Sequence, residues 1–171
     1  MATITFKGNP LHTTGHPPAP GSPMPSFTLT QNDLGELHSA ALAGKWAVLN
    51  IFPSVDTPVC AQSVRQFNRE AAGLPNTAVL CVSADLPFAA NRFCAAEGIK
   101  NVQMLSCFRH PEFGDILGIK IVDGPLLGLL ARAVVVLGPD GRVRHSELVP
   151  EIAREPNYAA ALAAIGGQER P

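Results

Sequence analysis

The sequence lacks the features that several large classes of protein require. Its four cysteines include no C-x-x-C pair, which argues against zinc ribbons and against disulfide reductases of the thioredoxin type. It has no run of basic residues and a net charge of -1, so nothing points to nucleic acid or an anionic membrane as a partner. No apolar stretch approaches the length of a membrane span.

Targeting and metal-binding patterns are also missing. The start, M-A-T-I-T-F-K-G-N-P, has no charged segment followed by a long apolar one, so we expect no signal peptide and a cytoplasmic location. In that reducing compartment the cysteines would be reactive rather than paired in structural disulfides. The five histidines are scattered and form no cluster with cysteines, so we expect no metal site.

What is present indicates one folded domain. The chain has 171 residues, of which 46% are hydrophobic and 16% charged, enough for a single sizeable core. We therefore expect one domain over residues 1–171, with an N-terminal hairpin and a proline-rich connector in about the first 25 residues.

Hydrophobic periodicity predicts an α/β fold. The apolar runs W-A-V-L-N-I-F and N-T-A-V-L-C-V-S-A are typical of buried central strands. The further elements expected are strands at 26–30 and 101–106, a helix at 58–72, a helix capped by Asp85 and ending at Gly98, a hairpin at 132–149 and a helix at 157–165. This order predicts a mixed central sheet flanked by helices on both faces, which fits a thioredoxin-like fold.

The stretch P-S-V-D-T-P-V-C places a cysteine where a helical pattern begins. With Thr57 as N-cap and Pro58 as the first helical residue, Cys60 lies in the first turn. Unpaired backbone N–H groups and the helix dipole there favour the nucleophilic thiolate. The Thr57 hydroxyl can approach the sulfur or a substrate oxygen, and Pro53 can shield the sulfur from water. The alternative is an inert core cysteine, and the flanking Pro53 and Thr57 argue against it.

The pattern P-x-x-x-T-x-x-C after an apolar strand resembles the active-site signature of the peroxiredoxins. The resemblance extends over almost the whole chain. The segments S-V-D-T-P-V-C-A-Q-S-V-R-Q-F-N, L-C-V-S-A-D-L-P-F-A, R-F-C-A-A-E-G and D-G-P-L-L-G-L-L-A-R-A-V-V-V are similar to those of the thiol peroxidases, the atypical two-cysteine peroxiredoxins of bacteria.

The resemblance implies an activity and a role for each site residue. Cys60 would be the peroxidatic cysteine and Cys94 the resolving cysteine, with Thr57, Pro53 and Arg132 around the reacting sulfur. The implied enzyme reduces hydrogen peroxide and alkyl hydroperoxides in antioxidant defence, passing through a Cys60 sulfenic acid and an intramolecular disulfide. The implied enzyme needs no metal or organic cofactor. Thioredoxin would be the reductant, and family members are commonly homodimers. The alternative is a redox sensor on the same fold, which the set Pro53, Thr57, Cys60 and Arg132 disfavours.

Two related resolving schemes do not fit. The C-terminal segment N-Y-A-A-A-L-A-A-I-G-G-Q-E-R-P has no cysteine that could serve a partner chain, and Arg65 stands five residues after Cys60, where another class has its resolving cysteine. Cys94 is the remaining match to the family, although R-F-C-A-A could also be a helix face packed on the core. Cys81 is expected to be buried, and Cys107 could be a spare reactive thiol.

A Cys60–Cys94 bridge would require motion. The Cα atoms of a disulfide lie within roughly 7 Å of each other, closer than is expected for a reduced pocket of this family. We therefore expect a helix end to unwind on oxidation, near Thr57 and Pro58 or in R-F-C-A-A-E-G. The leucines of D-G-P-L-L-G-L-L are expected to line an apolar entrance, a packed loop or a subunit interface.

Overall fold

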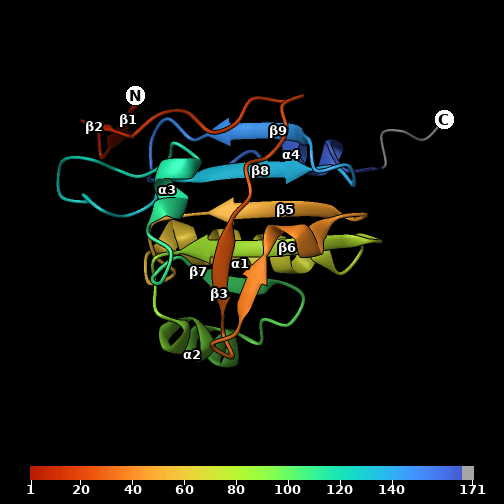
Figure 1. Cartoon of the computed structure of the whole chain (residues 1–171). Helices are drawn as coiled ribbons and strands as arrows, with labels where there is room; N and C mark the ends of the chain where they lie inside the picture. The colour runs from red at the N-terminus through yellow and green to blue at the C-terminus, as the bar shows by residue number, and fades with distance from the viewer. Residues whose placement is uncertain (167–171) are drawn as a thin grey trace.

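The central sheet is mixed and places the two apolar runs expected to be central strands near its middle. The structure, a computed structural model, describes residues 1–166. Its strands are β1 (Thr3–Phe6), β2 (Asn9–His12), β3 (Thr28–Gln31), β4 (Glu36–His38), β5 (Trp46–Ile51), β6 (Thr77–Ser83), β7 (Gln103–Ser106), β8 (Ala133–Leu137) and β9 (Val143–Leu148). The large sheet has the order β4-β3-β7-β6-β5-β8-β9, and β1 and β2 form a separate hairpin (Figure 1).

The apolar runs explain why β5 and β6 are central. They pair in parallel, with Val48 opposite Val79, and β5 pairs antiparallel with β8 on its other side. The sequence of a strand that is buried on both faces is a continuous apolar run, because neither face contacts water. The parallel pair needs a crossover, and the helix between the two strands supplies it.

Helices cover both faces of the sheet. They are η1 (Ser39–Leu42), α1 (Pro58–Ala71), α2 (Pro87–Glu97), α3 (Glu112–Ile116) and α4 (Tyr158–Ala163). On one face Val48 packs with Phe67 of α1 and Ala161 of α4. On the other face Leu49 packs with Phe113 of α3, and the β1–β2 hairpin joins the same core (Figure 1). The predicted thioredoxin-like α/β fold, with its N-terminal hairpin, is confirmed.

The sequence predictions failed at short elements and at one cap. Strand β4 and helix α3 were not expected, because three and five residues are too few to show a period. The expectation that Asp85 caps α2 was wrong, since Leu86 is the N-cap residue and the Asp85 carboxylate bonds elsewhere. The last five residues of the predicted domain 1–171 lie outside the described residues.

Over residues 1–166, no helix combines the length and the apolar character needed to cross a membrane. Within the same range, no group of three or more His, Cys, Asp and Glu side chains is arranged to hold a metal ion.

Candidate active site

Cys60 lies in the first turn of α1, at the carboxyl end of β5. The helix begins as the sequence predicts, with Thr57 as an extended N-cap residue and Pro58 in the first turn. The Cys60 side chain is completely buried. The N-terminus of a helix presents unpaired N–H groups, and these stabilise negative charge on a sulfur in the first turn.

Arg132 places a fixed positive charge against this sulfur. It precedes β8, is 1% exposed, and donates from Nη2 to the Cys60 Sγ at 3.3 Å. Its Nε donates to the carbonyl oxygen of Ile152 at 2.8 Å. Its Nη1 is buried and has no hydrogen-bond partner among the described residues. The guanidinium therefore stabilises a thiolate and keeps a spare donor for an oxygen atom of a ligand.

A cavity of about 380 Å³ opens beside this pair. Pro53, Thr57 and Arg132, the three residues expected around the sulfur, all line it. Its remaining walls are mostly apolar. They come from the N-terminal hairpin (Phe6 and Lys7), the Cys60 loop (Ser54, Pro58 and Val59), the stretch before Arg132 (Leu126 and Leu129) and the stretch after β9 (Ile152 and Ala153). Leu126 and Leu129 belong to D-G-P-L-L-G-L-L, so this stretch lines the cavity.

Thr57 is in the cavity wall, but its hydroxyl does not bond the sulfur. It donates to the carbonyl oxygen of Ser54 at 2.9 Å, and this closes the loop that leads into α1. In this conformation the hydroxyl shapes the loop, and Arg132 is the side-chain donor to the sulfur.

Asp85 holds the same loop from the neighbouring strand. Its carboxylate accepts hydrogen bonds from the Ser54 hydroxyl and the Val55 N–H, both at 2.7 Å, and from the Ser83 hydroxyl at 2.8 Å. Asp85 lies just after β6 and just before α2, so it connects the Cys60 loop with the start of the helix that carries Cys94. The sequence did not reveal this role, because Ser54 and Val55 lie about thirty residues away from Asp85.

A buried polar pair anchors the first turn of α1 to the sheet. Asn50, within the apolar run of β5, donates to the Ser63 hydroxyl at 3.0 Å, and Ser63 donates to the carbonyl oxygen of Cys60 at 2.7 Å. A buried amide in a central strand is costly unless it is hydrogen-bonded. The asparagine in W-A-V-L-N-I-F was the sequence signal that could have revealed this contact.

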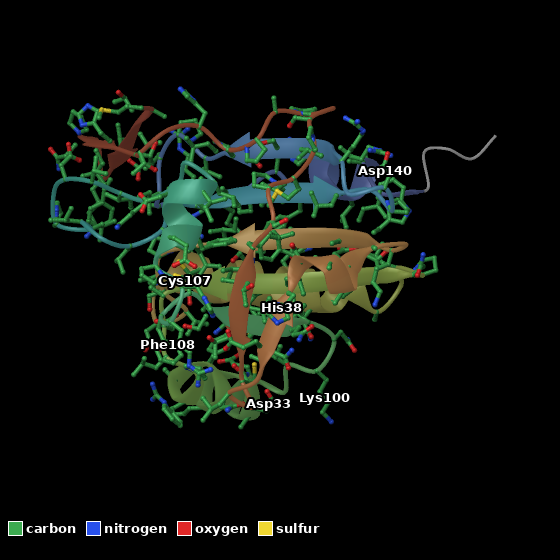
Figure 2. The ribbon with its side chains drawn as sticks, viewed as in Figure 1. Asp33, His38, Lys100, Cys107, Phe108 and Asp140 are labelled. Atoms are coloured by element: carbon green, nitrogen blue, oxygen red, sulfur yellow. The ribbon has the colours of Figure 1, made fainter. Side chains whose placement is uncertain are left out.

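Cys94 lies on α2 and faces a different opening. It is partly buried and packs against the apolar cluster that contains Cys60 and Cys81. It also lines a surface depression of about 380 Å³ together with Asp33 and Lys100, which lie on the same side of α2 in Figure 2. None of the four cysteines forms a disulfide within residues 1–166, so this is the reduced conformation.

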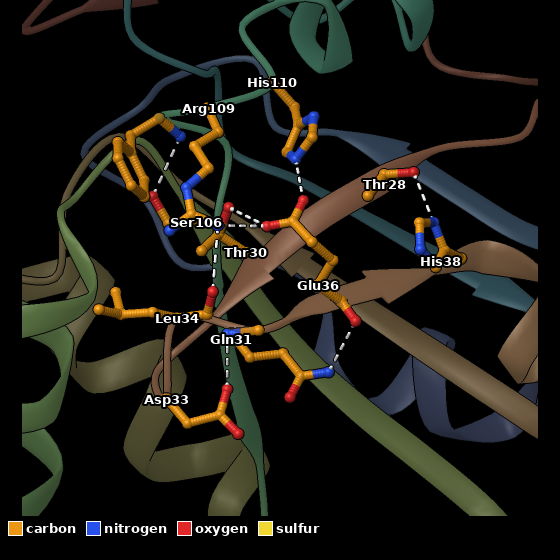
Figure 3. Close-up of polar contacts among 12 residues, drawn as sticks. Thr28, Thr30, Gln31, Asp33, Leu34, Glu36, His38, Ser106, Arg109 and His110 are labelled. Carbon is orange, nitrogen blue, oxygen red and sulfur yellow. Dashed lines mark hydrogen bonds and ion pairs between the residues drawn. The ribbon is translucent and has the colours of Figure 1, made fainter.

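A polar cluster between the β3–β4 hairpin and the loop after β7 was not expected from the sequence. Glu36 accepts hydrogen bonds from Arg109 at 2.7 Å and from Thr30 at 3.2 Å, and it pairs with His110 (Figure 3). The His110 contact, with Arg109, lowers the pKa of the Glu36 carboxyl. The cluster fastens the loop after β7 to the β3–β4 hairpin, and that loop carries Cys107 and Phe108 (Figure 2).

Burial makes two of the cysteines poor nucleophiles, which gives a first testable prediction. It raises the pKa of Cys81 to about 12 and that of Cys107 to about 11. Both thiols are therefore protonated at pH 8, and iodoacetamide should leave them unmodified in the native reduced protein, as mass analysis of tryptic peptides will show. All four cysteines should react in denaturant, and native labelling of Cys107 as fast as in denaturant would contradict the prediction.

A buried cysteine at a helix N-terminus, paired with an arginine on a thioredoxin-like sheet, defines a thiol-dependent enzyme of the peroxiredoxin type. Residues 19–162 match the redoxin family. Thiol peroxidases of Mycobacterium tuberculosis and Mycobacterium bovis are each 61% identical over 166 residues, which is 97% of this chain and 99% of theirs. The chain therefore belongs to the redoxin family, and within it to the thiol peroxidases.

Two solved structures share the fold. A peroxiredoxin-like protein from Aquifex aeolicus is 38% identical, with a TM-score of 0.89 over 95% of this chain and 94% of its own. A thiol peroxidase from Chromobacterium violaceum has the same fold at 21% identity, with a TM-score of 0.89 over 98% of each chain.

Proposed function

We propose that this protein reduces hydrogen peroxide and alkyl hydroperoxides through Cys60 and is regenerated by thioredoxin, as part of antioxidant defence. The observation that carries the proposal is the contact of Arg132 with Cys60, deep beside a cavity large enough for a small organic molecule. The burial of both groups strengthens their electrostatic interaction, because little water is present to screen it.

The first chemical step is a displacement at oxygen. The Cys60 thiolate attacks one peroxide oxygen and forms an S–O bond, while the O–O bond breaks and the other oxygen leaves as water or an alcohol after taking a proton. Negative charge spreads over both oxygens as the bond breaks. The spare Nη1 donor of Arg132 and the N–H groups at the start of α1 are suited to stabilise that charge. Cys60 is left as a sulfenic acid.

The cavity walls favour hydroperoxides with an organic substituent. Phe6, Leu126, Leu129 and Ile152 surround the approach to Arg132, and an alkyl chain would displace water from them. Arg132 lines the same cavity, and its free Nη1 donor is suited to bind a peroxide oxygen. This arrangement supports alkyl hydroperoxides as substrates beside hydrogen peroxide.

We propose that Cys94 resolves the sulfenic acid. Its thiol attacks the Cys60 sulfur, an S–S bond forms, and the hydroxyl group leaves as water. In the reduced conformation the two cysteines lie at different openings. Cys60 is bonded by Arg132, whereas Cys94 lines the depression beside Asp33. We therefore expect at least one helix end to unwind before the bridge forms. Pro58 stiffens the first turn of α1 and Pro87 that of α2, so the carboxyl end of α2, which carries Cys94, is the easier one to open.

Replacing Cys94 with serine should separate the two half-reactions. The variant should still consume about one equivalent of peroxide per chain, because Cys60 is intact, but turnover with thioredoxin, its reductase and NADPH should stop. Stopped-flow peroxide consumption and peptide mapping of the oxidised proteins measure both effects. The wild type should yield a Cys60–Cys94 disulfide. Full turnover by the serine variant would contradict the role of Cys94, and a wild type that forms the disulfide but turns over very slowly would favour a redox sensor.

We also propose that residues 1–171 act as one cytoplasmic domain and that two copies associate. Apolar side chains stand exposed around the end of the sheet that carries Cys60, among them Leu86 at 51%, Phe88 at 66% and Phe108 at 40%. A second copy that covered them would remove this apolar surface from water and enclose the active-site loop.

A further inference from the structure

The orientation of Arg132 depends on a single backbone carbonyl. Of its three guanidinium nitrogens, Nη2 contacts Cys60, Nη1 has no partner among residues 1–166, and Nε donates to the oxygen of Ile152. The planar guanidinium is rigid, so the Nε bond fixes the direction in which the other two nitrogens point. Whatever holds the Ile152 carbonyl in place therefore also aims Arg132 at the sulfur.

Ile152 lies in a segment without regular structure, after the end of β9 at Leu148. Such a segment needs other contacts to keep one conformation. The adjacent side chain provides them, because the Glu151 carboxylate accepts a hydrogen bond from the N–H of Ala153 at 2.8 Å and so folds back across Ile152.

The same carboxylate binds the turn of the N-terminal hairpin. It accepts hydrogen bonds from the N–H of Gly8 and the hydroxyl of Thr5, both at 2.9 Å, and from the N–H of Lys7 at 3.2 Å. Backbone bonds continue the connection, since the N–H of Ile152 donates to the carbonyl of Thr5 at 2.9 Å. One side chain thus joins two walls of the active-site cavity.

The hairpin turn is shaped to meet this carboxylate. Lys7 has a φ of 52° and Gly8 a φ of 82°, a left-handed conformation that a lysine adopts at some cost. It directs two successive N–H groups at Glu151. Hydrogen bonds from the N–H groups of Ala153, Gly8 and Lys7 lower the pKa of the Glu151 carboxyl to about 2, so the group is ionised at every physiological pH.

We propose that Glu151 is a positioning residue, which fixes the Ile152 carbonyl and through it the approach of Arg132 to Cys60. The inference rests on the peroxidase function and on the role of Arg132 proposed above. Glu151 itself touches neither the sulfur nor the cavity. An amide cannot replace the carboxylate, because it has one oxygen and its NH₂ group would face two of the four donors.

A double-mutant cycle tests this role. Glu151→Gln is expected to lower the second-order rate constant for hydrogen peroxide about tenfold in the wild-type background, because a small displacement of a catalytic group is costly. With Arg132→Met already present, the same change should lower the residual rate less than about twofold. Rates are measured by stopped flow with enzyme at stoichiometric concentration. Asp140→Asn is the matched control, since Asp140 also accepts a backbone N–H but lies at the opposite end of β8.

The outcomes separate positioning from simple stabilisation. If Glu151 only stabilised the fold, Glu151→Gln would lower the thermal midpoint and the rate by the same amounts in the wild-type and Arg132→Met backgrounds. That result would overturn the proposal. An unchanged rate in Glu151→Gln with an active wild type would overturn it as well, whereas an inactive wild type would overturn the proposed function. If Glu151→Gln does not fold, Thr5→Val removes one of the four donors, and its smaller loss of rate should likewise vanish with Arg132→Met.

Discussion

Replacing Cys60 with serine is expected to abolish peroxide reduction entirely. A serine hydroxyl stays protonated at neutral pH, even beside a guanidinium, and is a far weaker nucleophile toward oxygen than a thiolate. The fold should survive, because the change removes little volume and Arg132 can donate to the new oxygen. The measurement is peroxide consumption at pH 7, with hydrogen peroxide and with cumene hydroperoxide.

Cys81→Ala is the control for this experiment. Cys81 is also completely buried and lies in the same apolar cluster, but its thiol faces Asn50 rather than Arg132. The variant should lose some stability and keep its rate constant within about twofold, as expected of a residue that only fills space. A Cys60→Ser protein that consumes peroxide at the wild-type rate would remove the central claim and direct attention to the other cysteines.

Replacing Arg132 with methionine should have the second largest effect. The variant loses the positive charge and the Nη1 and Nη2 donors. This loss is expected to lower the rate constant for peroxide by about 10²- to 10³-fold, the usual cost of removing a donor that stabilises charge in a transition state. Methionine fills most of the same space, so the folded protein should persist. Arg132→Lys should be only partly active, because an ammonium group cannot bond Ile152 and the sulfur in the fork geometry of Arg132.

Arg92→Met provides the comparison for Arg132. Arg92 has an exposed side chain and a long ion pair with Asp56 at 3.7 Å, at the same side of the molecule. Its loss should leave the rate unchanged, since exposed pairs contribute little. Equal rates for Arg132→Met and the wild type would show that the helix N-terminus alone activates Cys60.

The Cys60 loop could be predicted because its determinants are local. Thr57, Pro58 and Cys60 lie within one helical turn, so capping and the dipole define their environment without any distant partner. The apolar runs of β5 and β6 are equally local, and they were sufficient to predict the central strands. The expectation that Asp85 caps α2 was also local, but it was wrong. The Asp85 carboxylate instead accepts hydrogen bonds from Ser54 and Val55 of the Cys60 loop.

The remainder of the site depends on which segments the sheet brings together. The sequence suggested Arg132 only through a family resemblance, since 72 residues separate it from Cys60, and its contact arises because β8 pairs beside β5. Three of the four bonds of Glu151 join it to the hairpin, more than 140 positions away, and the Ile152 carbonyl lies 20 residues from Arg132. Residue periodicity carries no information on such pairs. Strand order and register decide them, and these follow from the burial of the whole core rather than from any one segment.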